Sequence, residues 1–113
     1  MFLLNNGIKI IKHIEVADSF YKRTKGLLGE KKIEDDYGMF FPSCNFIHTF
    51  FMLFDIDVVM VDKKLKVVYT KQKMKPFGAA FCFEAAHTFE FATGIIRKKK
   101  IKKGDLLELE CGD

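Results

Sequence analysis

The sequence predicts a mostly β domain, arranged as a small barrel of about seven short strands with one N-terminal helix. Three observations predict this fold class. Short runs alternate apolar and polar residues, turn signals recur roughly every ten residues, and one stretch has helical spacing. The length of 113 residues predicts a single domain over residues 1–113.

The first part of the chain predicts one strand followed by one helix. Residues 8–16 alternate in the manner of a half-buried strand. Asp18 and Ser19 offer an N-cap for a short helix over residues 19–28, whose apolar residues recur at i, i+7 and i+8 and so share a face. Gly29 is a natural end for this helix.

The remaining elements are mostly strands. Residues 47–54 and 56–61 are apolar on both faces, which is typical of strands covered from both sides. Residues 62–64 predict a turn into a strand over 66–74. The later part of the chain predicts strands near 81–83 and 89–91 and a helical turn from Ile95. It also predicts a turn at 103–105 and a last strand near 107–109. We expect the Phe-rich stretches at 40–41, 81–83 and 89–91 to be core.

Composition favours a soluble cytoplasmic protein. The net charge of +4 and the pI near 8.9 permit an acidic partner without implying one. Cys44, Cys82 and Cys111 are an odd number, which we interpret as reduced thiols. The first residues lack the charged region of a signal peptide, and no apolar run approaches the roughly 20 residues of a membrane span.

An ordered series of short motifs extends over nearly the whole chain. Its centre is Pro42-x-Cys44-x-x-Ile47-His48-Thr49-x-x-Met52, followed by an Ile-Asp-Val element over 56–62. The other motifs are Arg23 to Gly29, Gly38 to Phe41, Lys75-Pro76-Phe77, Phe89-Glu90 with Gly94, and Gly104-Asp105. The series resembles the uncharacterised family catalogued as domain of unknown function 192. This resemblance implies a compact, mostly β, barrel-like fold with short helices, and it brings no established activity, cofactor or catalytic residue.

The chain departs from that family's pattern at three places. Leu53 stands where a basic residue is common, and Asp55 stands where a proline is common. Lysines occupy 98–100, where a glycine usually ends a short helix. The first departure weakens any anion-binding role for the strand that holds Leu53, and the last predicts a different end for the segment over 95–103.

Polar groups inside the apolar stretch 47–62 are the best candidates for a site, because burying them unpaired costs about 1–3 kcal/mol each. In a strand, His48 and Met52 share one face and could project into a pocket at a barrel mouth. There His48 could act as acid, base or ligand anchor, or it could be a structural histidine bonded to backbone or to an aspartate. Together with residues of the matched motifs, the candidate ligand-binding set is Cys44, His48, Thr49, Met52, Asp57, Lys75 and Glu90.

The cysteines, histidines and aspartates suggest three other kinds of chemistry. Cys44 lies four residues before His48 and could be a nucleophile beside a base, although no third orienting group is evident. Asp57 could do acid–base work, but our preferred interpretation is that it accepts backbone N–H bonds or pairs with a cation. Cys44-x3-His48 and Cys82-x4-His87 have admissible spacing for zinc, yet the resemblance does not extend to Cys82 or His87. We therefore predict no metal and no cofactor.

The basic run Arg97 to Lys103 holds six cations in seven residues and no aromatic residue for base stacking. We interpret it as a solvated turn and expect no nucleic-acid partner. The functional prediction is an uncharacterised, non-catalytic binding module for a small molecule or a protein, with a pocket around His48, acting as a monomer or weak homodimer away from membranes. The alternative is a small hydrolase or transferase that uses His48 with Cys44 or Asp57, and the sequence leaves open whether the protein is an enzyme.

Overall fold

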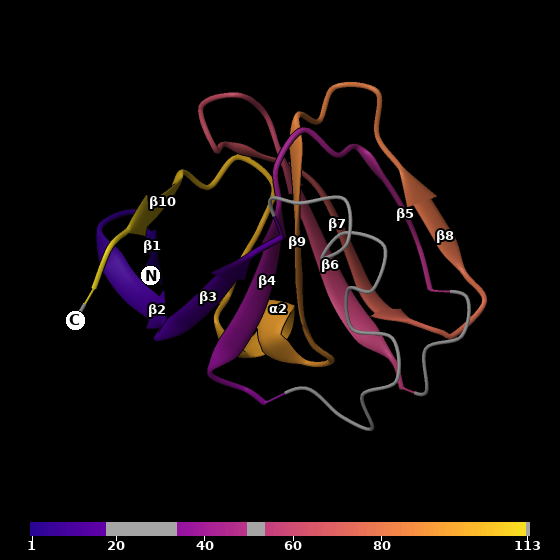
Figure 1. Ribbon diagram of the computed structural model, residues 1–113, viewed down its shortest axis with the longest axis horizontal. Coiled ribbons are helices and arrows are strands. Elements are labelled where there is room, and N and C mark those ends of the chain that lie inside the picture. Colours follow the sequence, from indigo (N-terminus) through magenta and orange to yellow (C-terminus); the bar gives the residue numbers. More distant parts are fainter. Residues whose placement is uncertain (18–33, 50–53, 113) are drawn as a thin grey trace.

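The computed structural model describes residues 1–17, 34–49 and 54–112, which form three β-sheets and one short helix (Figure 1). The predicted mostly β class is therefore confirmed. The strands are β1 (Phe2–Asn5), β2 (Ile8–Ile11), β3 (His13–Val16), β4 (Tyr37–Phe41), β5 (Phe46–His48), β6 (Ile56–Val61), β7 (Val67–Met74), β8 (Ala79–Phe81), β9 (His87–Ala92) and β10 (Leu107–Glu110), and the helix is α2 (Ile95–Lys98).

The three sheets are arranged as layers. Their strand orders are β10-β1-β2, β3-β4-β9-β6-β7 and β5-β8, and in Figure 1 they stand in this order from left to right. The five-stranded sheet is thus the middle layer. All its neighbouring strands are antiparallel except β3 and β4, which run parallel. Every residue of β6 is buried, as expected from a segment that is apolar on both faces.

Each face of the middle sheet carries its own core. On one face Phe89 and Phe91 pack with the three-stranded sheet and α2, and the Phe40 ring lies 4.7 Å from the Phe89 ring, centroid to centroid. A Cβ atom on Gly38 would meet the Phe91 ring at 2.5 Å, so a glycine is needed there. The other face is built from three methionines, one phenylalanine and smaller aliphatic residues, and it packs against β5 and β8. The residues of this second core are Ala17, Met39, Phe41, Ile47, Ile56, Val58, Met60, Met74, Ala80 and Ala85.

The described strands do not close into the small barrel that was predicted and remain in three sheets. The three-stranded sheet is linked to the middle one by single contacts, such as the Ile14 N–H bond to the Met1 carbonyl and the Lys66–Leu106 bridge. The expected strand over 8–16 is divided, because β2 and β3 belong to different sheets. Residues 2–5 form a strand that was not predicted.

The helices were predicted in part. The helical turn from Ile95 is confirmed as α2, whereas the helix expected over 19–28 lies outside the described residues. Within the described part of the chain, no helix is long and apolar enough to cross a membrane.

Candidate functional site

The predicted site residues occupy several separate places. His48 lies exposed on β5, while Ile47 beside it points into the second core. Thr49 and Lys75 meet at a turn, Asp57 lies at α2, and Glu90 is buried in the middle sheet. Met52 lies outside the described residues. The described members of the predicted set therefore lie apart, rather than together around His48.

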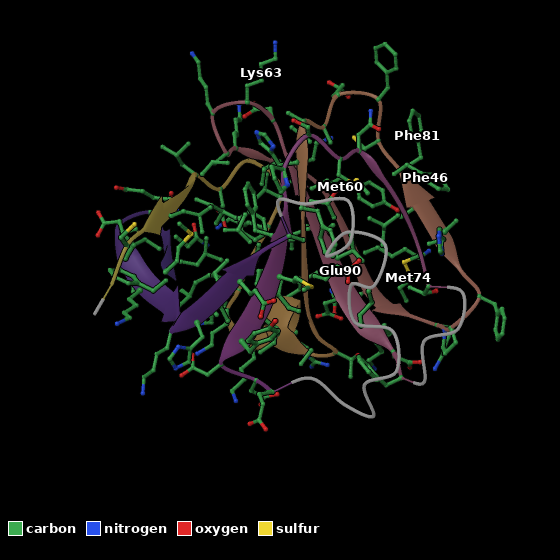
Figure 2. The ribbon with its side chains drawn as sticks, viewed as in Figure 1. Phe46, Met60, Lys63, Met74, Phe81 and Glu90 are labelled. Atoms are coloured by element: carbon green, nitrogen blue, oxygen red, sulfur yellow. The ribbon has the colours of Figure 1, made fainter. Side chains whose placement is uncertain are left out.

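His48 lies instead on a surface rich in exposed phenylalanine. Phe46 and Phe81 are opposite each other in the β5–β8 ladder (Figure 2). His48 is opposite Ala79 in the same ladder, so all four residues share the outer face. We call the exposed residues Phe46, His48, Phe77, Phe81 and Phe83 the aromatic surface. Its phenylalanine side chains are 51%, 69%, 56% and 86% exposed, in chain order. Large apolar side chains exposed side by side, as Phe46 and Phe81 are, are typical of an interaction site.

This exposure corrects the prediction that Phe81 and Phe83 are core residues. Phe40, Phe41 and the phenylalanines of β9 are buried, as predicted. Phe81 and Phe83 show the same alternation in sequence, but β8 pairs with β5 alone and nothing in the described part of the chain covers its outer face. Sequence alternation indicates that one face of a strand differs from the other, and it does not say which face is covered.

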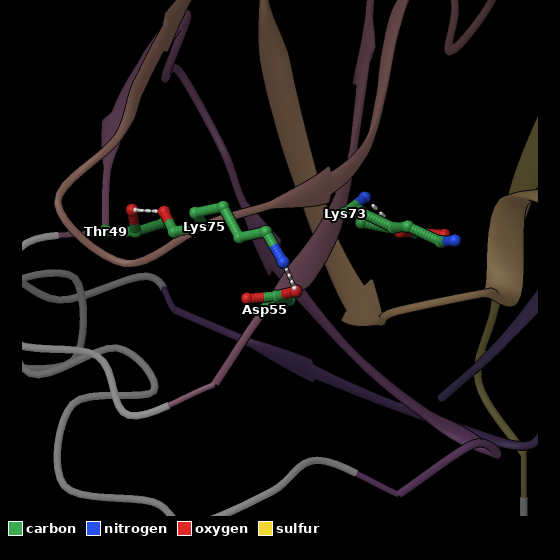
Figure 3. A network of polar contacts seen from close by, with 5 residues as sticks. Thr49, Asp55, Lys73 and Lys75 are labelled. Carbon is green, nitrogen blue, oxygen red and sulfur yellow. Dashed lines mark hydrogen bonds and ion pairs between the residues drawn. The ribbon is translucent and has the colours of Figure 1, made fainter.

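Thr49 holds the turn that presents Phe77. Its hydroxyl donates to the Lys75 carbonyl at 2.6 Å (Figure 3). It also accepts the Gly78 N–H at 2.8 Å. Two backbone hydrogen bonds also join Thr49 to the turn. The Thr49 N–H donates to the Gly78 carbonyl, and the Phe77 N–H donates to the Thr49 carbonyl. Phe77 has a φ of 64°, which is uncommon for a bulky side chain. Thr49 is thus a buried brace for a strained, exposed aromatic residue.

Lys75 lies in the same turn and forms an ion pair with Asp55 at 2.7 Å (Figure 3). The lysine side chain is largely exposed, so this pair contributes about 0–1 kcal/mol to stability. Asp55 occupies the position where the resembling family commonly has proline. The ammonium group of Lys75 is therefore already partnered.

Cys44 is half-buried and its thiol donates to the Phe46 carbonyl at 3.1 Å. Its own carbonyl accepts the Thr88 hydroxyl at 2.7 Å, which ties this segment to β9. Nearby, Nδ1 of His87 accepts the Ser43 N–H at 2.9 Å, and burial lowers the pKa of His87. The described residues contain no group of three or more histidine, cysteine or acidic side chains placed to hold a metal ion.

Asp57 fills the structural role that was the preferred interpretation. It is completely buried, and its carboxylate accepts N–H bonds from Lys73 at 3.0 Å, Gly94 at 3.1 Å and Ile96 at 2.9 Å. Gly94 and Ile96 lie at the start of α2, so Asp57 satisfies backbone donors that the helix itself leaves unpaired. In register it is opposite Phe91, on the face of the sheet away from β5.

Glu90 lies at the centre of the opposite face, between Met39 of β4 and Val58 of β6. Its side chain is only 5% exposed, and it lies on the side of the middle sheet that carries Met60 and Met74 (Figure 2). No described residue donates a hydrogen bond or forms an ion pair with its carboxyl group. Burial raises the pKa of Glu90 to about 8, so the group is mostly protonated at neutral pH.

Comparisons with known proteins agree with this fold. The model of the DUF192 family, described as an uncharacterized ACR, matches residues 3–109. A UPF0127 protein of Thermococcus gammatolerans is 33% identical over 99 residues, covering 84% of this chain and 65% of the relative. UPF0127 protein TK1120 of Thermococcus kodakarensis is 33% identical over 98 residues, covering 83% and 62%. The chain thus spans less than two thirds of the length of either relative.

Two solved structures share the fold at low sequence identity. A protein of unknown function from Novosphingobium aromaticivorans superposes with a TM-score of 0.84 at 18% identity, covering 96% of this chain and 84% of the other. A Sinorhizobium meliloti protein proposed to be a transcription regulator superposes with a TM-score of 0.77 at 19% identity, covering 84% and 79%. The motif series, the matched family model and the two archaeal relatives agree, and this chain belongs to the uncharacterised DUF192 (UPF0127) family.

Proposed function

We propose that this protein is a non-catalytic binding module that takes an extended, apolar segment of a partner protein beside β8, over the aromatic surface. The observation that carries the proposal is the coincidence of exposed phenylalanine side chains with a strand edge that pairs with no other described strand, which we call the open edge. Apolar contacts would supply affinity, and backbone hydrogen bonds would align the segment. The predicted pocket around His48 is thereby replaced by a surface that contains His48.

The open edge follows from the hydrogen bonds of the β5–β8 ladder. Thr49 N–H bonds to the Gly78 carbonyl at 2.9 Å, and Cys82 N–H bonds to the Asn45 carbonyl at 3.1 Å. In an antiparallel ladder hydrogen-bonded pairs alternate with pairs whose backbone groups point outward. Ala79 and Phe81 therefore direct their N–H and C=O groups away from β5. A two-stranded ribbon is marginal by itself, so an added strand would also stabilise it.

A protein segment fits this surface better than a small molecule does. The aromatic side chains lie on the outer face of a sheet, which is an open surface and not a pocket. Small ligands, in contrast, are usually bound in concave pockets. Aromatic side chains are enriched at the centres of protein interfaces and dominate their binding energy. The strain at Phe77 supports the same interpretation, since unusual backbone conformations concentrate at ligand contacts.

The catalytic alternative gains no comparable support. A hydrolase or transferase would need His48 beside Cys44 or Asp57. The Cys44 thiol donates to a carbonyl, and all the described bonds of Asp57 are to backbone N–H groups in the interior. His48 is exposed on the opposite side of the middle sheet from Asp57.

Peptide selection tests the proposal directly. Peptides would be selected from a random library on the intact protein, and their dissociation constants would be measured by fluorescence anisotropy. We expect apolar, strand-forming peptides whose affinity falls at least about tenfold in Phe81→Lys, which removes an aromatic contact, and in Ala79→Pro, which removes an outward N–H. Melting temperatures would be recorded for each variant to confirm folding.

Ile8→Lys is the matched control, because Ile8 is 69% exposed on β2, outside the aromatic surface. It should leave peptide affinity unchanged. Equal losses in Ile8→Lys and Phe81→Lys would show that the peptides recognise general apolar exposure, and the proposal would then fail. Selection of peptides that contact neither Phe81 nor Ala79 would also overturn it.

His48→Ala is expected to weaken binding of the selected peptides several-fold and to change the melting temperature by less than about 3 °C. The reason is that His48 is exposed on the same face as Phe46, so its removal opens no cavity. Thermal melts and anisotropy on the same preparation check this. A fall of many degrees with unchanged affinity would make His48 a structural brace.

A further inference from the structure

Lysines from distant parts of the chain meet around one surface cavity of about 330 Å³. The cavity lies between β2, the residues that precede β4, and the end of α2. We call it the lysine groove, and its charged lining residues are Lys9, Lys12, Asp35, Asp36, Lys98 and Lys99. Ile10 and Ile11 add an apolar part to the wall.

The charges in the lysine groove do not cancel. Asp35 forms an ion pair with Lys98 at 3.1 Å, and Asp36 forms one with Lys12 at 3.8 Å. Asp36 also accepts the backbone N–H of Lys12 at 2.8 Å. Both carboxylates are thus occupied, and four lysines against two aspartates leave an excess of two positive charges.

The two remaining lysines are differently placed. The Lys9 ammonium group lies 4.4 Å from the centre of the Phe2 ring, a contact that leaves the charge uncompensated. Lys99 is half-buried and forms no ion pair with the described residues. A compact anion in the groove would therefore find cations that lack an acidic partner.

We propose that the lysine groove binds a small molecule that carries a di- or triphosphate group. Its volume lies within the range of small-ligand pockets, and its mixed apolar and cationic wall suits a phosphate attached to an organic group. The groove differs from the aromatic surface in position and chemistry, so this ligand would be independent of the protein segment proposed above.

A nucleic acid fits the same charges less well. A polyanion would be expected to engage the whole basic run over 97–103, but only Lys98 and Lys99 of that run line the groove. Lys102, in the same run, is paired with Asp105 at 3.2 Å. The concave placement favours a compact phosphate over an extended one.

Titration with inorganic pyrophosphate and with ADP tests the proposal, using the full chain at low salt, with calorimetry for affinity and amide chemical shifts for location. We expect saturable binding, with the largest shifts at Lys12 and Lys99. Lys9→Glu and Lys99→Glu should each weaken binding about tenfold or more. Asp35→Asn should strengthen binding several-fold, because it removes a competing carboxylate from Lys98.

Lys64→Glu is the matched control, since Lys64 is an exposed lysine in the turn after β6, outside the groove. It should change affinity less than about twofold. The proposal is overturned if Lys64→Glu weakens binding as much as Lys99→Glu does, or if no binding occurs at about 5 mM pyrophosphate. It is also overturned if a single-stranded oligonucleotide binds more tightly and loses affinity equally in both variants, because the basic surface as a whole would then be responsible.

Discussion

Replacing Glu90 with glutamine is expected to stabilise the protein progressively as the pH rises. Relative to wild type, the free energy of unfolding of Glu90→Gln should increase by about 3–5 kcal/mol between pH 5 and pH 9. Burial raises the pKa of Glu90 from its ordinary value of 4.5 to about 8, and glutamine keeps the shape of the side chain without the titration. Urea unfolding of both proteins at several pH values measures the difference.

The direction follows from proton linkage. A raised pKa means that the folded protein holds the proton on Glu90 more tightly than the unfolded chain does. The stability associated with the neutral carboxyl group is therefore fully present below about pH 4.5 and is lost as the pH rises through about 8. At higher pH the wild-type fold must keep a charge between Met39 and Val58, where no described residue compensates it.

Glu110→Gln is the control for this experiment, because Glu110 is an exposed glutamate on β10. Its effect should stay within about 0.5 kcal/mol at every pH. A difference between wild type and Glu90→Gln that does not change with pH would contradict the expectation. It would mean that the carboxylate reaches water or a cation when it ionises.

The strands in the middle of the fold could be predicted from the sequence, because the residue pattern that identifies each strand lies within the strand itself. Residues 56–61 are apolar at nearly every position, and a strand with that pattern must be covered on both faces. The turn after β6 contains Asp62, whose side chain accepts the Lys64 N–H, and Gly94 directly precedes the helical turn. These features need no knowledge of what lies opposite them.

The way in which the strands divide among the three sheets could not be predicted from such patterns. β8 and β9 have similar alternating aromatic residues, yet β9 lies between β4 and β6, whereas β8 borders only β5. The resulting burial of Phe89 and exposure of Phe81 depend on pairing partners far away in the chain. Glu90 depends on distant pairing partners in the same way. Alternation in the sequence places it on a polar face of its strand, but in the structure that face is covered by the second core.

The candidate sites also depend on contacts between distant parts of the chain, which the sequence does not reveal. His48 was identified from its unusual position in an apolar run, but the exposed phenylalanines around it emerge only when β5 pairs with β8. The lysine groove joins residues 9–12 with residues 98–99, a separation that no local motif can reveal. Asp57 was predicted in part. Its burial followed from the apolar run around it, but its three backbone partners lie 16, 37 and 39 residues away and could not be identified from sequence.

Replacing Asp57 with alanine is expected to cost about 3–5 kcal/mol of stability, equivalent to a fall in melting temperature of roughly 15–25 °C. The substitution leaves three backbone N–H groups, those of Lys73, Gly94 and Ile96, without an acceptor that is itself completely buried. It should also loosen α2, whose Ile95 and Ile96 are part of the first core. Thermal and urea unfolding measure the loss, and amide exchange at Ile96 locates it.

Asp62→Ala separates this effect from the general removal of an aspartate. Asp62 accepts the N–H groups of Lys64 and Lys66 at 2.9 and 3.0 Å, so it makes similar bonds in an exposed turn. Water can replace its carboxylate there, and the cost should be only about 0.5–1.5 kcal/mol. Burial of the Asp57 carboxylate, rather than the number of bonds, would then account for the larger loss at Asp57. If both substitutions cost the same, water must enter the site beside α2, and Asp57 would not be the residue that secures the helix to the middle sheet.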